Sequence, residues 1–273
     1  MKIITSPTVT LVSRPQFIEH PDYPIPADGD EATRLGAFAT KCCYDSYGID
    51  GRPNEANQRA ILEHRHGSVL EHLNYGLFIE GITRALSLEL NRHRGLSPSQ
   101  RSTRYTKEGD GAIVLEPYYA QIYDKYNMRE DNGMYIADIE EDDETAKMEC
   151  RLVHEFLRAA HTAFQSYEEQ IRMIEALNPL NLKGTELRKY ARGKARNILP
   201  HSLETRATYT GNLRTWRWVI EARSDIHAET EIRVLAGKIY DVLSTECPLY
   251  FEDFEVLSVL GGARELYPRQ SKV

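Results

Sequence analysis

Hydrophobic and polar positions follow two periods along this chain, and each period predicts a type of element. An apolar residue at every third or fourth position indicates an amphipathic helix, whereas alternation of apolar and polar residues indicates a strand with one buried face. Alternation, or a run of β-branched and aromatic residues, predicts strands over Val9–Val12, Leu73–Ile82, Ala112–Leu115 and Leu203–Thr210. Val9–Val12 is expected to be the first strand, and Pro15 to end it.

Helical spacing recurs in longer segments between and after these strands. It predicts helices over Glu31–Tyr44, Glu55–His66, Thr83–His93, Thr145–Leu177, Glu186–Asn197, Asn212–Arg223 and Ala228–Ser244. Asn54 has the side chain of an N-cap for the second helix, and Gly95 and Pro98 are expected to end the third. Strands and long helices alternate irregularly. We therefore expect an α+β fold, with mixed helices and an antiparallel-type sheet, instead of regular β-α-β units.

The remaining segments are expected to be loops. Pro21–Asp30 is rich in proline, aspartate and glycine, which is typical of a loop, and Gly95–Gly111 is polar and irregular. Asp124–Glu144 is acidic and weakly patterned, which indicates a surface excursion instead of a linker between domains. A chain of 273 residues is long enough for one large domain or two intimate ones. We expect a single domain over residues 1–273, with an acidic insertion near residues 124–145.

The composition is that of an ordinary globular protein of the cytoplasm. Hydrophobic residues make up 41% of the chain and charged residues 27%. No apolar run approaches the roughly 20 residues of a membrane helix, and the first residues do not resemble a signal peptide. Such a protein is expected to be cytoplasmic, with no membrane contact. The cysteines show no paired spacing, which suits a reducing compartment: they are Cys42, Cys43, Cys150 and Cys247.

Charge is spread unevenly, although the net charge of −7 argues against non-specific nucleic-acid binding. Five arginines and one histidine lie between Arg84 and Arg104, against the single acid Glu89. A second basic stretch follows from Arg188 to Arg223, and an acidic run lies between the two. The arginine segments are equally compatible with a site for a small anion and with two solvated basic faces.

One predicted helix carries polar residues on its apolar stripe. At 100° per residue, Arg223 lies about 20° from Asn212 around the helix axis and His227 about 60° from it. Trp216 falls within about 40° of the same direction. A buried arginine needs a partner, and one alternative is a salt bridge from Arg223 to Glu221 or Asp225. A helix break near Ser224 would remove His227 from the stripe.

The arginine segment around residue 92 combines a helix end with a polar loop. Cations at a helix C-terminus favour its dipole, so Arg92-His93-Arg94 could act as a cap alone. The loop that follows supplies hydroxyls, one amide and the further arginines Arg101 and Arg104. Arginine forks and hydroxyls together suit phosphate. The residues therefore indicate an anion site.

Other common chemistries find little support in the sequence. His64, His66 and His72 cluster, but no paired cysteine or carboxylate lies at ligand spacing, so no metal is expected. The chain has neither a glycine-rich phosphate loop nor the elbow of a serine hydrolase. None of the cysteines has the basic surroundings that activate a thiolate, which argues against a cysteine nucleophile.

The motifs resemble those of the flavin-dependent thymidylate synthases (ThyX family). They occur in the family's order, and the resemblance runs from about Val9 to Phe254. The matching motifs are His66–His72 (H…EH), Arg92-His93-Arg94 with Ser102 (RHRx7S), Arg196–Pro200 (R-x-x-LP), and Asn212, Arg214 and Arg223 with His227-Ala228-Glu229 (NxR…R…HAQ).

The resemblance implies a reaction and an assembly. The family transfers a one-carbon unit from methylenetetrahydrofolate to C5 of dUMP, reduced FAD supplies the hydride that completes the methyl group, and NADPH reduces the flavin. The family fold is α+β, similar to the thymidylate synthase complementing protein. Its active sites form between subunits of a homotetramer.

The resemblance also implies roles for individual residues. Contacts with FAD are implied for His72, Asn74, Arg92, His93, Arg94, Gln100, Asn212, Leu213, Arg214 and Arg217. Contacts with dUMP are implied for Glu89, Arg92, Gln100, Arg101, Ser102, Thr103, Arg104, Arg196 and Arg223. Arg196 would bind the phosphate side. Arg223 would be catalytic, because a cation at the pyrimidine edge favours ionisation at N3 and makes C5 a better nucleophile.

The chain departs from the family pattern at a few positions. Many relatives carry Gln in place of Glu89, Glu in place of Gln100, and Asn or His in place of Arg217, and the HAQ glutamine is Glu229 here. The exchanges at 89 and 100 keep open an alternative, a flavin-dependent hydroxymethylation of a related pyrimidine nucleotide. A non-catalytic nucleotide- or RNA-binding module is the third reading, which the net charge disfavours.

Overall fold

The computed structural model describes residues 1–108, 111–131, 134–140 and 142–271, and the α+β class expected from the sequence is confirmed within them. Two compact units are built from interleaved segments of the chain. The first unit contains residues 1–7, 80–88 and 100–206, and the second unit contains residues 8–79, 89–99 and 207–273. The single domain expected over residues 1–273 stays a prediction.

Four strands form the largest sheet, in the order β2-β3-β8-β4. Their bounds are β2 Thr8–Ser13, β3 Asn74–Thr83, β8 Glu204–Asn212 and β4 Ser97–Gln100. The strands expected at β2, β3 and β8 are confirmed, with ends shifted by one or two residues. Strand β4 contradicts the irregular structure expected over Gly95–Gly111, of which residues 109–110 lie outside the described residues. As an edge strand of four residues, β4 is specified by its neighbour β8 and tolerates Pro98.

Three two-stranded sheets complete the strand pairing given for the described residues. Their strands are β1 Lys2–Ile4, β5 Ala112–Val114, β6 Arg129–Asp131, β7 Met134–Ile136, β9 Phe254–Leu260 and β10 Ala263–Pro268. The pairs β6–β7 and β9–β10 are antiparallel, as expected, but β1–β5 is parallel. The first strand is therefore β1, not the segment around Val9. Residues 132–133 and 141 of the predicted acidic excursion lie outside the described residues.

Helices α1 and α2 belong to the second unit and begin at caps of different origin. Helix α1, Glu31–Tyr44, has the predicted bounds, and the side chain of Asp30 accepts from the backbone N–H of Thr33 at 2.7 Å. Helix α2 spans Asn54–Glu63. The predicted Asn54 cap is wrong, because the Asp28 carboxylate accepts from the backbone N–H groups of Asn54 and Glu55, each at 3.0 Å.

The predicted helix over Thr83–His93 is shorter in the structure. Helix α3 spans Arg84–Leu90 and ends before the Arg92-His93-Arg94 motif. The chain then turns, because the backbone N–H of His93 donates to the carbonyl of Leu90 at 3.1 Å and that of Leu96 to the carbonyl of His93 at 2.9 Å. The motif therefore lies on a turn and is not part of the helix.

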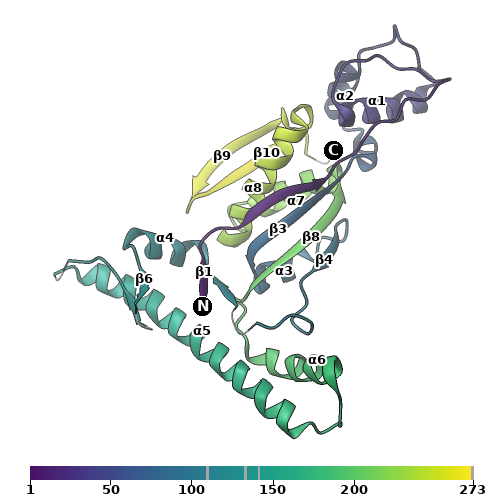
Figure 1. Ribbon diagram of the computed structural model, residues 1–273. Coiled ribbons are helices and arrows are strands. Elements are labelled where there is room, and N and C mark those ends of the chain that lie inside the picture. The colour runs from purple at the N-terminus through teal and green to yellow at the C-terminus, as the bar shows by residue number, and fades with distance from the viewer. Residues whose placement is uncertain (109–110, 132–133, 141, 272–273) are drawn as a thin grey trace. The chain divides into compact units, whose positions relative to one another are not determined.

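The first unit is organised along one long helix. Helix α5, Glu144–Leu177, buries a stripe that includes Val153, Leu157 and Phe164. Helices α4 and α6 pack against it (Figure 1), and the short 3₁₀ helix η2 follows α6. Their bounds are α4 Pro117–Lys125, α6 Gly184–Ala195 and η2 Arg196–Ile198. The predicted helix over Thr145–Leu177 is confirmed, and the one over Glu186–Asn197 ends in η2.

The second unit packs two helices against the C-terminal hairpin of β9 and β10. Helix α7, Leu213–Ser224, begins at the N-cap Asn212, whose side chain accepts from the backbone N–H of Thr215 at 2.8 Å. Helix α8 spans Thr230–Glu246, and both helices contact β10. The 3₁₀ helices η1 Gly67–His72 and η3 Pro248–Phe251 complete the unit. The hairpin has no counterpart among the predicted elements, which stop at Ser244.

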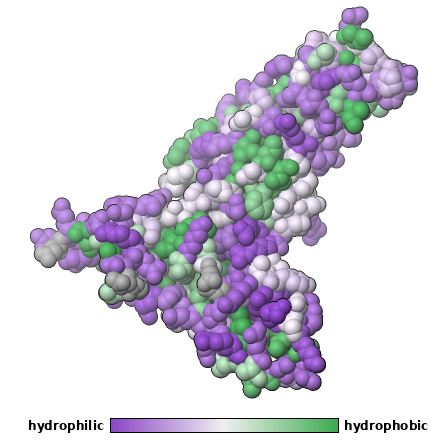
Figure 2. Space-filling view, in the orientation of Figure 1, coloured by the Kyte–Doolittle hydropathy of each residue, from purple (hydrophilic) through white to green (hydrophobic). Residues whose placement is uncertain are grey.

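The surface and the helices agree with the composition. Hydrophilic residues cover most of the face in Figure 2, and smaller hydrophobic patches lie among them. Within the described residues, no helix combines the length and the apolar character needed to cross a membrane.

Candidate active site

In the second unit, helix α7 brings Arg223 to the turn that carries His93. The Arg223 Nε–H donates to His93 Nε2 at 2.7 Å, and its Nη1 lies 3.4 Å from a carboxylate oxygen of Glu89. Arg223 therefore does have an acidic partner, but the partner is Glu89 on α3 and not Glu221 or Asp225. The three residues come from two motifs of the sequence, and the structure brings them together.

His93 is neutral in this arrangement. Its side chain is 3% exposed, and burial, together with the positive charge of Arg223, lowers its pKa to about 4. Because Nε2 accepts from Arg223, the ring proton of the neutral imidazole is on Nδ1. His93 Nδ1 is buried and has no hydrogen-bond partner among the described residues. A buried donor of this kind needs an acceptor, which a ligand can supply.

The two arginines beside His93 are exposed. Within the described part of the chain, no ion pair is formed by the guanidinium of Arg92 or that of Arg94. Trp218 packs edge-on against His93, with ring centroids 4.8 Å apart, and its side chain is 52% exposed. Trp218 belongs to none of the sequence motifs. An aromatic residue on the polar face of a predicted helix is the signal that identifies it.

The other predicted flavin residues on α7 differ in accessibility. Arg214 pairs with Glu71 at 2.6 Å and is half-buried. The side chain of Leu213 is fully buried. Arg217 is 2% exposed, and its guanidinium binds both oxygens of Asp253, each at 2.8 Å. That pairing commits the Arg217 fork to the fold, although Arg217 also lines a cavity along α7; the flavin contact expected of Arg217 stays a prediction.

A cavity of about 750 Å³ lies along α7 and β10 in the second unit. Trp218 and Arg223 line it together with His227. His227 lies beyond the end of α7 at Ser224, so it reaches the cavity from the α7–α8 loop and not from the helical stripe. The cavity is within the size range of small-molecule sites. His72 and Asn74 are exposed where η1 meets β3, and the Asn74 side chain donates to the carbonyl of His72 at 3.3 Å.

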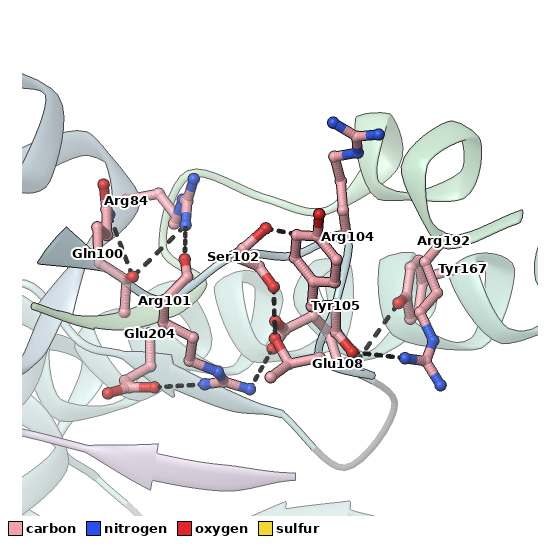
Figure 3. Close-up of polar contacts among 12 residues, drawn as sticks. Arg84, Gln100, Arg101, Ser102, Arg104, Tyr105, Glu108, Tyr167, Arg192 and Glu204 are labelled. Carbon is pink, nitrogen blue, oxygen red and sulfur yellow. Dashed lines mark hydrogen bonds and ion pairs between the residues drawn. The ribbon is translucent and has the colours of Figure 1, made fainter. Parts of the chain in front are cut away.

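In the first unit, four of the predicted nucleotide residues, Arg101, Ser102, Thr103 and Arg104, lie in a tight loop after β4 (Figure 3). The carbonyl of Ser102 accepts from the backbone N–H of Tyr105 at 3.2 Å and that of Thr106 at 3.1 Å. Thr103 is buried, and its hydroxyl accepts from Arg196 Nη1 at 3.1 Å. Ser102, the serine of the RHRx7S motif, is followed directly by Thr103. The Thr103 hydroxyl is in turn bound by Arg196 of the R-x-x-LP motif.

Two arginines of this region remain available to an anion. Arg104 is exposed, and Figure 3 shows its guanidinium pointing away from the contacts of the loop. Arg196 is also exposed, apart from its bond to Thr103. Arg192 on α6 donates to the carbonyl of Tyr105 at 2.7 Å and so adds a third positive charge. Arg192 belongs to the basic stretch of the sequence but to none of the motifs.

Arg101 does not have the position expected of a substrate ligand. Its Nη2 lies 2.7 Å from Glu108 and its Nη1 2.9 Å from Glu204. Arginine that is bound to two carboxylates inside the fold has little capacity left for a phosphate. Arg101 is thus bound within the loop, and the substrate contact expected of it stays a prediction.

Gln100 precedes this loop and is held by hydroxyl groups. Its side-chain Nε2–H₂ donates to Ser87 Oγ at 2.8 Å and to Thr205 Oγ1 at 3.1 Å. Both amide hydrogens are used by these bonds, so the amide orientation is fixed.

The buried cysteines are poor nucleophiles in this structure. Burial raises the pKa of the Cys247 thiol to about 12, which removes it as a nucleophile. Burial also raises the pKa of Cys150. No group of three or more potential metal ligands occurs among the described residues.

The second unit thus presents a neutral His93 with a donor for a ligand and an arginine beside it. The first unit separately presents exposed arginines with hydroxyls, which suit an anion. A family model described as thymidylate synthase complementing protein matches residues 27–249. Flavin-dependent thymidylate synthases of Mycobacterium bovis and Mycobacterium tuberculosis are each 35% identical over 257 residues, which is 93% of this chain and 92% of the relative. That of Mycobacterium marinum is 33% identical over 258 residues, with the same coverage.

The chain belongs to the thymidylate synthase complementing protein family, the family of these flavin-dependent enzymes. A solved structure also resembles it, that of the UMP/dUMP methylase PolB from Streptomyces cacaoi bound with 5-Br dUMP. The TM-score is 0.62 at 19% identity, and the match covers 92% of this chain and 95% of the other. That similarity is one of fold.

Proposed function

We infer that this chain is an FAD-dependent thymidylate synthase, which converts dUMP to dTMP with methylenetetrahydrofolate as carbon donor and NADPH as reductant. Two lines support the inference. Relatives that carry this name cover 93% of the chain. The observation that carries it within the structure is the neutral His93, whose buried Nδ1–H lacks an acceptor beside Arg223.

The residues of the second unit fit a bound flavin. The ring carbonyls and ring nitrogens of FAD are acceptors of the kind that His93 Nδ1 requires. Trp218 packs against His93 and leaves an exposed aromatic surface for the flavin ring. The exposed arginines suit the pyrophosphate of FAD. Bound FAD, once reduced, supplies the hydride that completes the new methyl group. The residues proposed to hold it are His72, Asn74, Arg92, His93, Arg94, Asn212 and Arg214.

The residues of the first unit fit a nucleoside monophosphate. We propose that Arg104 and Arg196 bind the phosphate and that the hydroxyls of Ser102 and Thr103 complete its cradle. Gln100 precedes this cradle, and its amide is held in one orientation by Ser87 and Thr205.

Arg223 is proposed as the catalytic residue. Its guanidinium stabilises negative charge that develops on the pyrimidine, which favours loss of the N3 proton and raises the nucleophilicity of C5. Glu89 lies 3.4 Å from the same guanidinium. A substrate anion that binds Arg223 therefore replaces Glu89 or joins it at the guanidinium. The presence of Glu89, where many relatives carry Gln, therefore bears on the choice of substrate.

A homotetramer is part of the proposal. In the family pattern each active site combines residues from different subunits, and we propose the same for this chain. Light scattering on the purified protein measures the assembly, and a monomer that still turns over dUMP would remove this part of the proposal.

The flavin spectrum with and without dUMP tests the function. Purified protein is expected to bind FAD, to be yellow, and to oxidise NADPH faster when dUMP is present. A protein that no added FAD can occupy would overturn the inference. Product mass separates the alternative reaction: a methyl product from dUMP supports thymidylate synthesis, whereas a hydroxymethyl product would replace it.

A further inference from the structure

The loop that carries the proposed nucleotide residues is closed at its base by one arginine between two carboxylates. Arg101 opens the loop and Glu108 closes it, and their side chains meet at 2.7 Å. The other nitrogen of the Arg101 fork binds Glu204, at the start of β8, at 2.9 Å. Figure 3 shows the three side chains in one row under the loop. We call Arg101, Glu108 and Glu204 the clamp.

The clamp is deeply placed. The side chain of Glu108 is 1% exposed and that of Glu204 9%. Burial raises the pKa of Glu108, and the positive charge of Arg101 opposes that rise. Removing one partner of a buried ion pair leaves the other charge uncompensated. The clamp holds one positive charge between two carboxylates, so loss of Arg101 or of its contact with Glu108 leaves buried negative charge uncompensated.

Further bonds connect the clamp to the atoms of the loop. Thr106 Oγ1 lies 3.1 Å from Glu108 and 2.7 Å from the carbonyl of Ser102. The backbone N–H of Glu108 donates to the hydroxyl of Tyr167 on α5 at 3.4 Å. Arg84 donates to the carbonyl of Arg101 at 3.2 Å. Both ends of the loop are thus fixed by buried or half-buried groups, while Arg104 near its middle is exposed.

We propose that Glu108 and Glu204 are positioning residues for nucleotide binding, which act through Arg101 to hold Ser102, Thr103 and Arg104 in their binding arrangement. Neither carboxylate touches the substrate. The clamp orders the loop before the nucleotide arrives, so the entropy of ordering the loop is not lost on binding. This inference rests on the proposed function, because it names dUMP as the ligand of the loop.

The test uses Glu108→Gln, which keeps the shape of the side chain and removes its charge. Glu168→Gln is the matched control: Glu168 lies on α5, 3.0 Å from Lys107 of the same loop, and outside the clamp. Amide hydrogen exchange over residues 101–108 reports the order of the loop without any ligand. The dissociation constant for dUMP and the KM and kcat of the holoenzyme report its use.

We expect Glu108→Gln to speed exchange in the loop by at least about tenfold and to raise the dissociation constant and KM for dUMP by about tenfold or more, since displacements of about 1 Å at a site can cost 10²-fold. The FAD spectrum and the dissociation constant for FAD stay unchanged, because the flavin residues lie elsewhere. Glu204→Gln is expected to behave alike, and Glu168→Gln like the wild type.

Unchanged loop exchange in both clamp variants would overturn the inference. Faster exchange with unchanged dUMP affinity would also overturn it, because the clamp would then serve the fold alone. A wild-type holoenzyme that binds FAD but not dUMP would instead refute the proposed function, and the exchange result would still show whether the clamp orders the loop.

Discussion

The guanidinium of Arg223 sets the protonation state of the His93 imidazole, and the imidazole fixes the position of the guanidinium by a hydrogen bond. A charged arginine 2.7 Å away and a buried position both disfavour a second positive charge, so the imidazole stays neutral. The acceptor nitrogen faces Arg223, and the donor nitrogen is left for a ligand. The same guanidinium reaches Glu89, which anchors it from the other side.

Replacing Arg223 by lysine tests this geometry. Lysine keeps the charge, but its single ammonium on a different stem does not reproduce a fork bound to both His93 and Glu89. We expect kcat/KM for dUMP to fall by about 10²-fold, in the range measured when one positioned donor is lost from a catalytic site. Steady-state kinetics on the FAD-bound enzyme measure it. Arg158→Lys, on the exposed face of α5, is the control, and activity of Arg223→Lys within twofold of wild type would contradict the proposal.

The low pKa of His93 predicts a stability that depends on pH. A histidine whose pKa is about 6.5 unfolded and about 4 folded contributes stability that is fully present above 6.5 and is lost as the pH falls through 4. Between pH 7 and pH 4 this group alone should lower the free energy of unfolding by about 3 kcal/mol. Urea denaturation across that range, compared with His93→Gln, isolates the contribution. His64→Gln, at an exposed position, is expected to keep the wild-type slope; an equal slope in His93→Gln would show that this histidine is not responsible.

At the scale of elements, hydrophobic spacing predicts most helices and three strands of the main sheet because each buries one face against the core. The errors occur where the cause lies far along the chain. The cap of α2 comes from Asp28, 26 residues before Asn54, and no local pattern encodes it. Strand β4 is extended because it pairs with β8. The chain turns after α3, and the turn brings His93 to Arg223, which a continued helix would not do.

The Asp28 cap can be measured directly. Its two carboxylate oxygens accept separate backbone N–H groups at the start of α2; burial opposes ionisation, but these bonds lower the pKa of Asp28 below its usual range. Asp28→Asn keeps one acceptor oxygen and loses the charge, so we expect a loss of about 1 to 2 kcal/mol in the free energy of unfolding. Chemical denaturation measures it, with Asp22→Asn in the same loop as control. If the two variants are equally stable, Asp28 is not the cap that holds this helix.

At the scale of the whole molecule, the sequence motifs predict which residues matter better than they predict what each one does. Arg101 and Arg217 both belong to predicted site segments, yet the structure binds each to carboxylates inside the fold. A sequence position cannot distinguish an arginine that faces a ligand from one that faces a buried glutamate or aspartate, because the partners Glu108, Glu204 and Asp253 carry no motif. The division of the site residues over two compact units is likewise a property of interleaved segments that no linear pattern reveals.

Because the site residues are divided over two compact units, we expect FAD and dUMP to stabilise different segments of the chain. A ligand that binds only the folded state at 100 times its dissociation constant adds about 2.7 kcal/mol to the free energy of unfolding. We expect FAD at that excess to raise the melting temperature and to slow hydrogen exchange over residues 89–99 and 212–223. Subsequent dUMP should add a further rise and slow exchange over residues 101–108, since the flavin residues lie in the second unit and the phosphate residues in the first. CDP at the same concentration is the control for an unspecific anion effect. Protection by dUMP confined to residues 89–99 would mean that the exposed arginines of the first unit do not hold the nucleotide, and Arg104 and Arg196 would lose their assigned role.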